Sequence, residues 1–97
     1  MTPLREWAVL QLKSDDRRFL IGLRSSPRLP EIAGPIQSFN PKARAFRTAD
    51  GQDFEVLDLG LVSVDARRAW RHWCRENGEP GFTEVTEEYE DAINAER

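Results

Sequence analysis

The hydrophobic period of this chain changes once, at Gly60, and that change restricts the fold more than any other feature. Before Gly60, apolar side chains recur at every second position in short runs, a pattern typical of β-strands. After it, Ala66, Trp70 and Trp73 follow the i, i+4, i+7 spacing of one helix face. Strands that precede helices in this way predict an α+β domain rather than alternating βαβ units.

The part before Gly60 contains five segments with the length and pattern of strands, at residues 7–12, 19–23, 36–40, 44–48 and 53–59. Asp50-Gly51 lies between the last two, and a glycine that accepts a positive φ makes this the strongest hairpin signal. Residues 25–35 carry three prolines and Gly34, which predict the longest loop of the domain. We expect a strongly bent antiparallel sheet of about five strands, similar to a small barrel.

A helix packed on this sheet is predicted from about Val64 to Asn77. Ser63 is suited to cap its N-terminus, and Asp65 complements the helix dipole in the first turn. Gly78 follows as a stop signal. Trp70 and Trp73 share the inner stripe of this helix, so we expect their rings to pack against the sheet.

A second, acidic helix is predicted from about Glu84 to Ala95, with Thr83 as its cap. Its apolar stripe is thin and consists of Val85, Tyr89 and Ile93. An isolated helix of this length is marginal in water, so the stripe is expected to dock on the rest of the domain. The sequence therefore divides into a core domain at residues 1–82 and an acidic C-terminal segment at residues 83–97.

Charge is distributed unevenly along the chain. The formal net charge of −3 combines +4 over residues 1–75 with −7 over residues 76–97. Such asymmetry acts on partners through long-range fields. Twelve of the 14 basic residues are arginines, which hold carboxylates and phosphates in bidentate geometry better than lysines do. Codon usage in a genome rich in G and C would give the same bias.

Two charged surfaces are candidate binding sites. The first is the outer face of the helix at 64–77, where Arg67, Arg71 and Arg75 follow each other at i, i+4 and i+8 and are flanked by Arg68 and His72. This face would bind an acidic protein surface or phosphates, unless it is an ordinary solvated face. The second is the acidic helix, with Glu84, Glu87, Glu88 and Asp91. These acids would cover the arginines, imitate the charge of a nucleic acid, or keep the protein soluble.

Catalytic chemistry is not indicated. His72 and Cys74 are the single histidine and cysteine, and residues two positions apart on a helix point about 200° apart, so they form no nucleophile–base pair. No further histidine or cysteine is present to complete a zinc site. The glycines lack a phosphate-binding spacing. We therefore expect no enzymatic activity, no metal and no cofactor.

The leading hypothesis is a non-enzymatic protein-binding module, an adaptor or inhibitor acting through charged surfaces. The alternative is a nucleic-acid-binding small β-barrel. For that alternative, the segment from Phe39 to Phe54, with Lys42, Arg44 and Arg47 between its aromatic residues, is the candidate stacking platform. The chain has no apolar run near the ~20 residues of a membrane span. Residues 1–6 lack a signal pattern, and one cysteine fits a reducing compartment, so a cytoplasmic location is expected.

The middle of the chain resembles a pattern in short uncharacterised bacterial and prophage proteins. The matching stretches are Ser26-Pro27-Arg28-Leu29-Pro30, Gly34-Pro35-Ile36-Gln37-Ser38-Phe39 and the Thr-x-x-Gly-x-x-aromatic hairpin from Thr48 to Phe54. The resemblance covers about a third of the chain and implies a small curled sheet, without an activity. The small size, the acidic C-terminus and the lack of a catalytic set are also similar in general character to phage-encoded inhibitors such as anti-CRISPR proteins.

Overall fold

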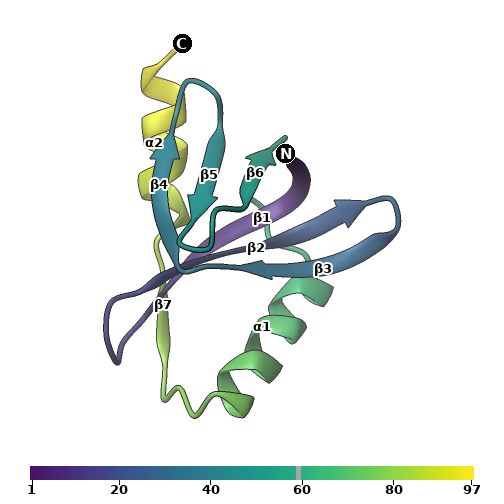
Figure 1. The fold of residues 1–97 in the computed structure, drawn as a ribbon, viewed down its shortest axis with the longest axis vertical. Coiled ribbons are helices and arrows are strands. Elements are labelled where there is room, and N and C mark those ends of the chain that lie inside the picture. The colour runs from purple at the N-terminus through teal and green to yellow at the C-terminus, as the bar shows by residue number, and fades with distance from the viewer. Residues whose placement is uncertain (59) are drawn as a thin grey trace.

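The computed structural model describes residues 1–58 and 60–97, which form one seven-stranded sheet and two helices (Figure 1). The strands are β1 (Thr2–Leu12), β2 (Arg18–Ser25), β3 (Arg28–Ala33), β4 (Ile36–Asn40), β5 (Ala45–Thr48), β6 (Asp53–Val56) and β7 (Phe82–Glu84), and the helices are α1 (Val64–Glu76) and α2 (Thr86–Ala95). The strand order is β3-β2-β1-β6-β5-β4, with β7 paired to β1. The predicted α+β class is confirmed, although β1 and β6 run parallel and β7 lies between the two helices rather than before them.

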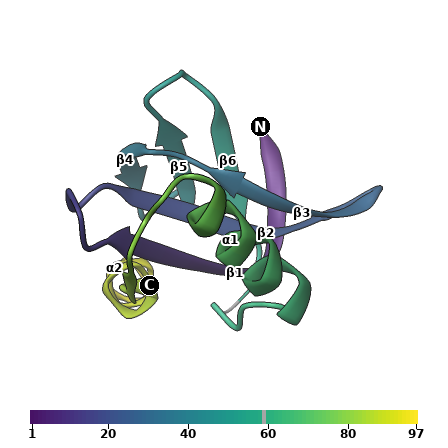
Figure 2. The same cartoon turned by 90° about the horizontal axis from the view of Figure 1, so that it is seen from below.

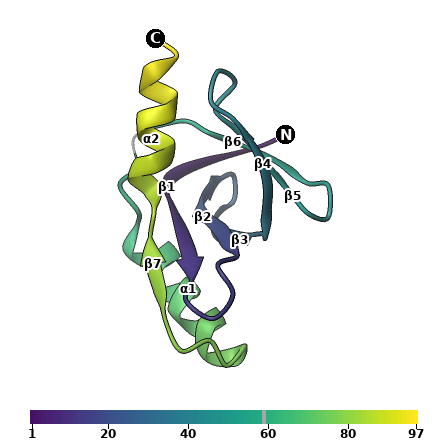
Figure 3. The same cartoon turned by 90° about the vertical axis from the view of Figure 1, so that its left-hand side faces the viewer.

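β1 belongs to both halves of the sheet. Its beginning pairs with β6, whereas its later residues pair with β2 and β7. Between Arg5 and Ala8 the register with β2 shifts, and Glu6 has a positive φ of 49°. The Asp58 carboxylate accepts the Glu6 backbone N–H at 3.1 Å and stabilises this irregularity. The sheet bends here, so that its two halves face each other across a core (Figure 3).

Both faces of the β1–β2 pair are buried, because each face packs against different elements. One cluster lies between the two halves of the sheet and contains Leu4, Trp7, Val9, Leu20, Ala33, Phe46, Phe54, Val56 and Ile93. The other cluster lies under α1, which covers the β1–β3 half (Figure 2), and contains Ala8, Leu10, Leu12, Phe19, Ile21, Leu23, Ala66, Trp70 and Cys74. Consecutive residues of each strand alternate between the clusters, as the strand pleat requires.

α1 has the boundaries and the caps that the sequence predicts. Ser63 Oγ accepts the backbone N–H of Ala66 at 2.9 Å, and Gly78 has a φ of 66° just beyond the C-cap. The Trp70 and Trp73 rings lie 5.5 and 4.8 Å from the ring of Phe19 on β2, measured between centroids. The expected packing of both tryptophans on the sheet is confirmed.

The long loop predicted at residues 25–35 is wrong, because residues 28–33 form β3. Pro30 lies opposite Leu23 of β2 within this strand. β3 is the terminal strand of the sheet, and an edge strand tolerates proline because its outer side needs no hydrogen-bond donor. Pro30 therefore indicates an edge strand rather than a loop.

α2 docks through the predicted stripe. Ile93 is buried, and Val85 and Tyr89 pack against the same cluster. The predicted start is wrong: Thr83 lies in β7 opposite Gln11, and Val85 precedes the helix without a side-chain cap. Strand pairing with β1 holds Thr83 extended, and the boundary predicted between residues 82 and 83 falls inside this strand. Neither helix is long and apolar enough to cross a bilayer.

Candidate functional site

The outer face of α1 carries the predicted arginines and is the principal candidate site. Because Ala66, Trp70 and Cys74 are buried against the sheet, the opposite face of the helix points outward. Arg68 and Arg71 are exposed on this face, as is Arg75 in the last turn. The cationic surface that the sequence predicts therefore exists as a contiguous part of one helix.

Arg67 does not belong to the free part of this surface. Its Nη2 lies 3.4 Å from Glu84 Oε1 of β7. Thr86 Oγ1 donates to the other oxygen of the same carboxylate at 3.0 Å and accepts the Val9 backbone N–H. The structure thus joins one member of the predicted basic surface to one member of the predicted acidic surface, and Glu84 is held by both contacts.

A shallow hollow of about 490 Å³ lies between α1 and the edge strand β3. Its lining combines an apolar floor with charged walls and consists of Pro30, Asp65, Arg68, Ala69, His72 and Arg75. His72 Nε2 lies 2.7 Å from Glu76 Oε1, one turn further along the helix. Two arginines face one aspartate here, so the hollow is cationic. The sequence did not reveal this hollow, because Pro30 was assigned to a loop rather than to a strand beside α1.

Three of the four arginines of α1 differ from most of the other arginines in their pairing. Among the residues described, six arginines lie within ion-pair distance of a carboxylate: Arg17, Arg18, Arg24, Arg28, Arg47 and Arg67. Arg44 donates instead to the backbone carbonyls of Val56 and Asp58, at 2.9 Å each. No carboxylate or carbonyl among the described residues lies within bonding distance of the guanidinium groups of Arg68, Arg71 or Arg75. The guanidinium groups of these three arginines face solvent.

The acidic helix lies at the other end of the molecule's long axis from α1 (Figure 1). Glu88 is engaged by Arg18 of β2, whose pKa is raised by hydrogen bonds to Tyr89 and Glu88. Glu87 and Asp91 are exposed, and no ion pair reaches them from any described residue. α2 therefore does not cover the arginines of α1, and of the predicted acidic surface only Glu84 contacts them.

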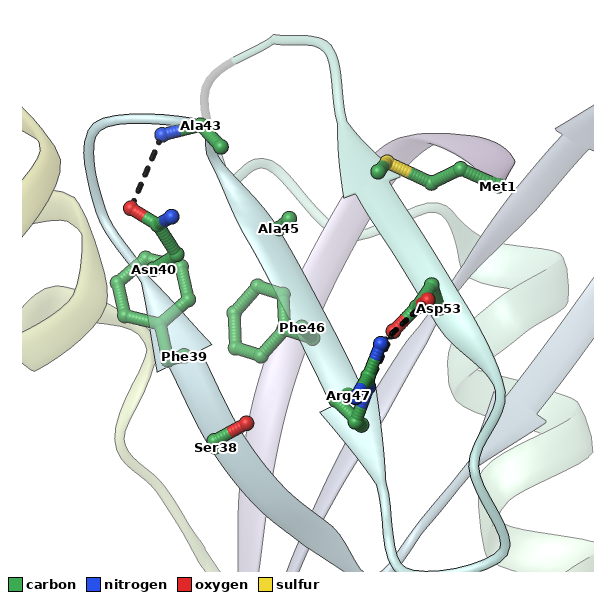
Figure 4. Close-up of a pocket in the computed structure, with 9 residues that line it drawn as sticks. All are labelled: Met1, Ser38, Phe39, Asn40, Ala43, Ala45, Phe46, Arg47 and Asp53. Carbon is green, nitrogen blue, oxygen red and sulfur yellow. Dashed lines mark hydrogen bonds and ion pairs between the residues drawn. The ribbon is translucent and has the colours of Figure 1, made fainter.

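The aromatic segment proposed as a stacking platform faces the core. Phe46 and Phe54 are buried, and the half-buried Phe39 contacts Phe46 with centroids 4.4 Å apart. Arg47 binds Asp53 through two hydrogen bonds of 2.8 and 3.1 Å, which lower the pKa of the Asp53 carboxyl. Figure 4 shows this ion pair at a hollow of about 480 Å³ on the outer side of β4–β6. These buried rings are not available to stack on bases.

His72 and Cys74 occupy different environments, as helix geometry predicts. Cys74 is 6% exposed, and burial together with the nearby Glu79 charge raises the pKa of its thiol. His72 is exposed and contacts Glu76. No group of three or more histidine, cysteine, aspartate or glutamate side chains converges anywhere in residues 1–58 and 60–97.

No protein-family model, curated protein or solved structure matches the chain. The resemblance of residues 26–54 to short phage and bacterial proteins therefore stays an expectation, and the function is argued from the surfaces described above.

Proposed function

We propose that this chain is a non-enzymatic protein-binding module, an adaptor or an inhibitor, that receives an acidic segment of its partner on the outer face of α1. The observation that carries the proposal is the set of solvent-facing guanidinium groups at Arg68, Arg71 and Arg75. Seven other arginines are already paired with carboxylates or carbonyls, namely Arg17, Arg18, Arg24, Arg28, Arg44, Arg47 and Arg67, whereas no described contact pairs these three. An incoming carboxylate at α1 therefore displaces no internal partner.

The hollow beside α1 supports a peptide segment as the occupant. Arg68 and Arg75 stand beside the apolar side chains of Pro30 and Ala69. Bidentate contacts between guanidinium and carboxylate orient the bound segment. The apolar floor buries an apolar side chain of the partner away from water. A segment with carboxylates on either side of one aliphatic residue matches this arrangement.

The second surface gives the module a contact of opposite sign. Glu87 and Asp91 are exposed on α2, at the end of the molecule opposite α1. A partner with a basic surface would meet these acids without disturbing the α1 site. Opposite charges at the two ends orient the molecule as it approaches a partner, which raises association rates more than affinity.

A direct binding measurement tests the proposal. The probe is a short peptide of glutamates around one leucine, with a second peptide of glutamines in their place. The triple variant R68E/R71E/R75E should bind the glutamate peptide at least tenfold more weakly than the natural chain. R5E/K13E/K42E is the matched control, because it reverses three exposed basic residues elsewhere and lowers the net charge equally. Both variants should melt near the natural chain, since exposed charges contribute little stability.

Duplex DNA and single-stranded RNA serve as competing probes for the alternative function. Binding to duplex DNA through phosphates weakens with salt, with a log–log slope of about −0.9 per phosphate neutralised. The proposed protein-binding function would be contradicted if the chain bound a nucleic acid more tightly than the glutamate peptide, with such a slope. Loss of this binding in R68E/R71E/R75E would establish nucleic-acid binding through the α1 face. Equal losses in the two triple variants would show that net charge rather than the α1 face is responsible.

A further inference from the structure

The hollow between α1 and β3 contains the single histidine of the chain. The two elements lie next to each other (Figure 1), and His72 lines the hollow together with Arg68 and Arg75. The His72 side chain is 65% exposed, so protons and a bound partner can both reach its ring. Histidine is the side chain whose charge ordinarily changes between pH 5 and 8. The charge of the hollow therefore depends on the protonation of this ring.

The fixed charges around the ring cancel one another. Arg68 and Arg75 contribute two positive charges, and Asp65 contributes one negative charge to the lining. Glu76 stands outside the lining but contributes a second negative charge, because its Oε1 lies 2.7 Å from His72 Nε2. These four charges sum to zero while the ring is neutral, and protonation of the ring makes the total +1.

The strand that faces the ring does not change this balance. Pro30 is the residue of β3 that lines the hollow. The charged residues of β3 are Arg28 and Glu31, and each is paired with an opposite charge, on Glu6 and Arg24 respectively. Each of these ion pairs is neutral as a whole. Among the described residues, the net charge at the hollow is thus set by α1.

Two further arginines belong to α1. Arg67 is paired with Glu84 of β7. Arg71 is exposed, is not part of the lining of the hollow and has a fixed charge. Arg71 attracts a carboxylate at every pH, so an acidic segment keeps part of its affinity for the α1 face when the His72 ring is neutral.

We infer that protonation of His72 regulates the α1 site, so that an acidic segment binds more tightly as the pH falls from 8 to 5.5. This inference rests on the proposed function, because it concerns the same surface. One unit charge about 4 Å from a carboxylate in water changes the affinity about fivefold, and salt reduces the effect. Linkage requires the reciprocal effect, in which the bound segment holds the proton on His72.

The test measures binding of the peptide of glutamates around one leucine at pH 5.5 and at pH 8.0, in low salt. Glutamate ordinarily titrates near pH 4.3, so the peptide keeps its charge over this range. The natural chain should bind at least threefold more tightly at pH 5.5. H72Q should lose this difference. H72K has a fixed positive charge and should bind at both pH values about as tightly as the natural chain does at pH 5.5.

Two pairs of variants control for effects outside the hollow. H72Q/Q52H moves the histidine to an exposed position between β5 and β6 and should bind equally at both pH values. E76Q removes the acid beside the ring and should tighten binding at pH 8.0 about threefold. E87Q makes the same change at an exposed position on α2 and should leave the affinity unchanged.

Nuclear magnetic resonance measures the reciprocal effect directly. Because the chain contains one histidine, the Cε1–H signal of His72 is assigned without ambiguity. Its titration midpoint should move about 0.5 pH higher or more at saturating glutamate peptide. The glutamine peptide should leave the midpoint unchanged.

The outcomes separate this inference from the proposed function. Binding of the glutamate peptide that is equal at pH 5.5 and pH 8.0 would overturn the inference and leave the proposed function standing. The same holds if H72Q or H72Q/Q52H keeps the pH dependence of the natural chain, or if the bound peptide leaves the midpoint of His72 unchanged. An equal gain in E76Q and E87Q would also overturn it. No binding at either pH would contradict both proposals.

Discussion

Arg18 and Glu88 connect the beginning of β2 to α2 through two hydrogen bonds, from Nη1 to Oε1 at 3.0 Å and from Nη2 to Oε2 at 3.2 Å. Arg18 Nη1 also donates to the Tyr89 hydroxyl at 3.1 Å. The side chains are 30% and 59% exposed, and exposed ion pairs contribute little to stability. The pair therefore fixes the orientation of α2, while apolar burial supplies most of its attachment.

Deleting residues 86–97 should consequently destabilise the domain. Burial of an aliphatic or aromatic side chain is worth about 1.5–3 kcal/mol when complete, and the deletion removes Ile93 and Tyr89 from the core. We expect a loss of at least ~2 kcal/mol, or a melting temperature lower by about 8 °C or more for a domain of this size. Circular dichroism melting measures this. R18Q should cost less than about 1 kcal/mol, and an unchanged melting temperature after the deletion would contradict apolar docking.

Trp70 should be sensitive to truncation and tolerant of phenylalanine. Trp70 is fully buried against Phe19 and Phe82, so W70A should cost about 3–5 kcal/mol. Its Nε1 is buried without a hydrogen-bond partner in the described structure, so W70F removes an unsatisfied donor and should cost less than half as much as W70A. Denaturant titration measures both.

Trp7 provides the matched comparison. It is equally buried, but its Nε1 donates to the Asp58 carbonyl at 2.7 Å. W7F removes this hydrogen bond, although Arg44 Nη2 still donates to the same carbonyl at 2.9 Å. W7F should therefore cost more than W70F, by about 0.5–1.5 kcal/mol. Equal losses of unfolding free energy in W7F and W70F would show that the two indole N–H groups do not differ in their hydrogen bonding.

Gly34 should not accept a side chain. A Cβ at this position would lie 2.5 Å from Cδ2 of the Phe19 ring, which is packed in the cluster under α1. G34A should therefore cost about 1–3 kcal/mol through overpacking. G81A is the control, because a Cβ there meets the flexible Lys13 chain at 3.3 Å. Denaturant titration compares the two, and an equally stable G34A would mean that the ring moves aside at little cost.

Local signals in the sequence predicted the elements that local interactions determine. Ser63 and Gly78 define the ends of α1 because a cap and a positive φ depend on a few adjacent residues. β3 and β7 were missed because strand pairing is long-range. Pro30 is accommodated only because β3 is an edge, and Thr83 is extended only because Gln11 lies beside it.

The candidate site shows the same difference between features set by local interactions and features set by long-range packing. The sequence predicted the outward arginines of α1, since the position of the apolar stripe determines which residues face away from it. It did not predict that Arg67 contacts Glu84, or that Pro30 closes a hollow beside Arg68. Both features depend on which strand lies next to α1, and the spacing of residues along the sequence does not determine that arrangement.

The thiol of Cys74 should make stability depend on pH above neutrality. Burial, with the Glu79 charge, raises the pKa of this thiol in the folded state. Below the unfolded pKa of about 8.5, the thiol is neutral in both states and costs nothing. As the pH rises further, the unfolded chain ionises first and gains free energy, so folding stability falls until the folded thiol also ionises.

The difference between the natural chain and C74A isolates this effect from the other groups that titrate at high pH. Unfolding free energies from denaturant titration at pH 7 and at pH 9.5 should differ more in the natural chain, by up to about 1.4 kcal/mol per pH unit between the two pKa values. The same burial should make the folded thiol react slowly with an aromatic disulfide reagent and rapidly once denaturant is added. Parallel pH profiles, together with fast labelling of the folded chain, would show that Cys74 is open to solvent.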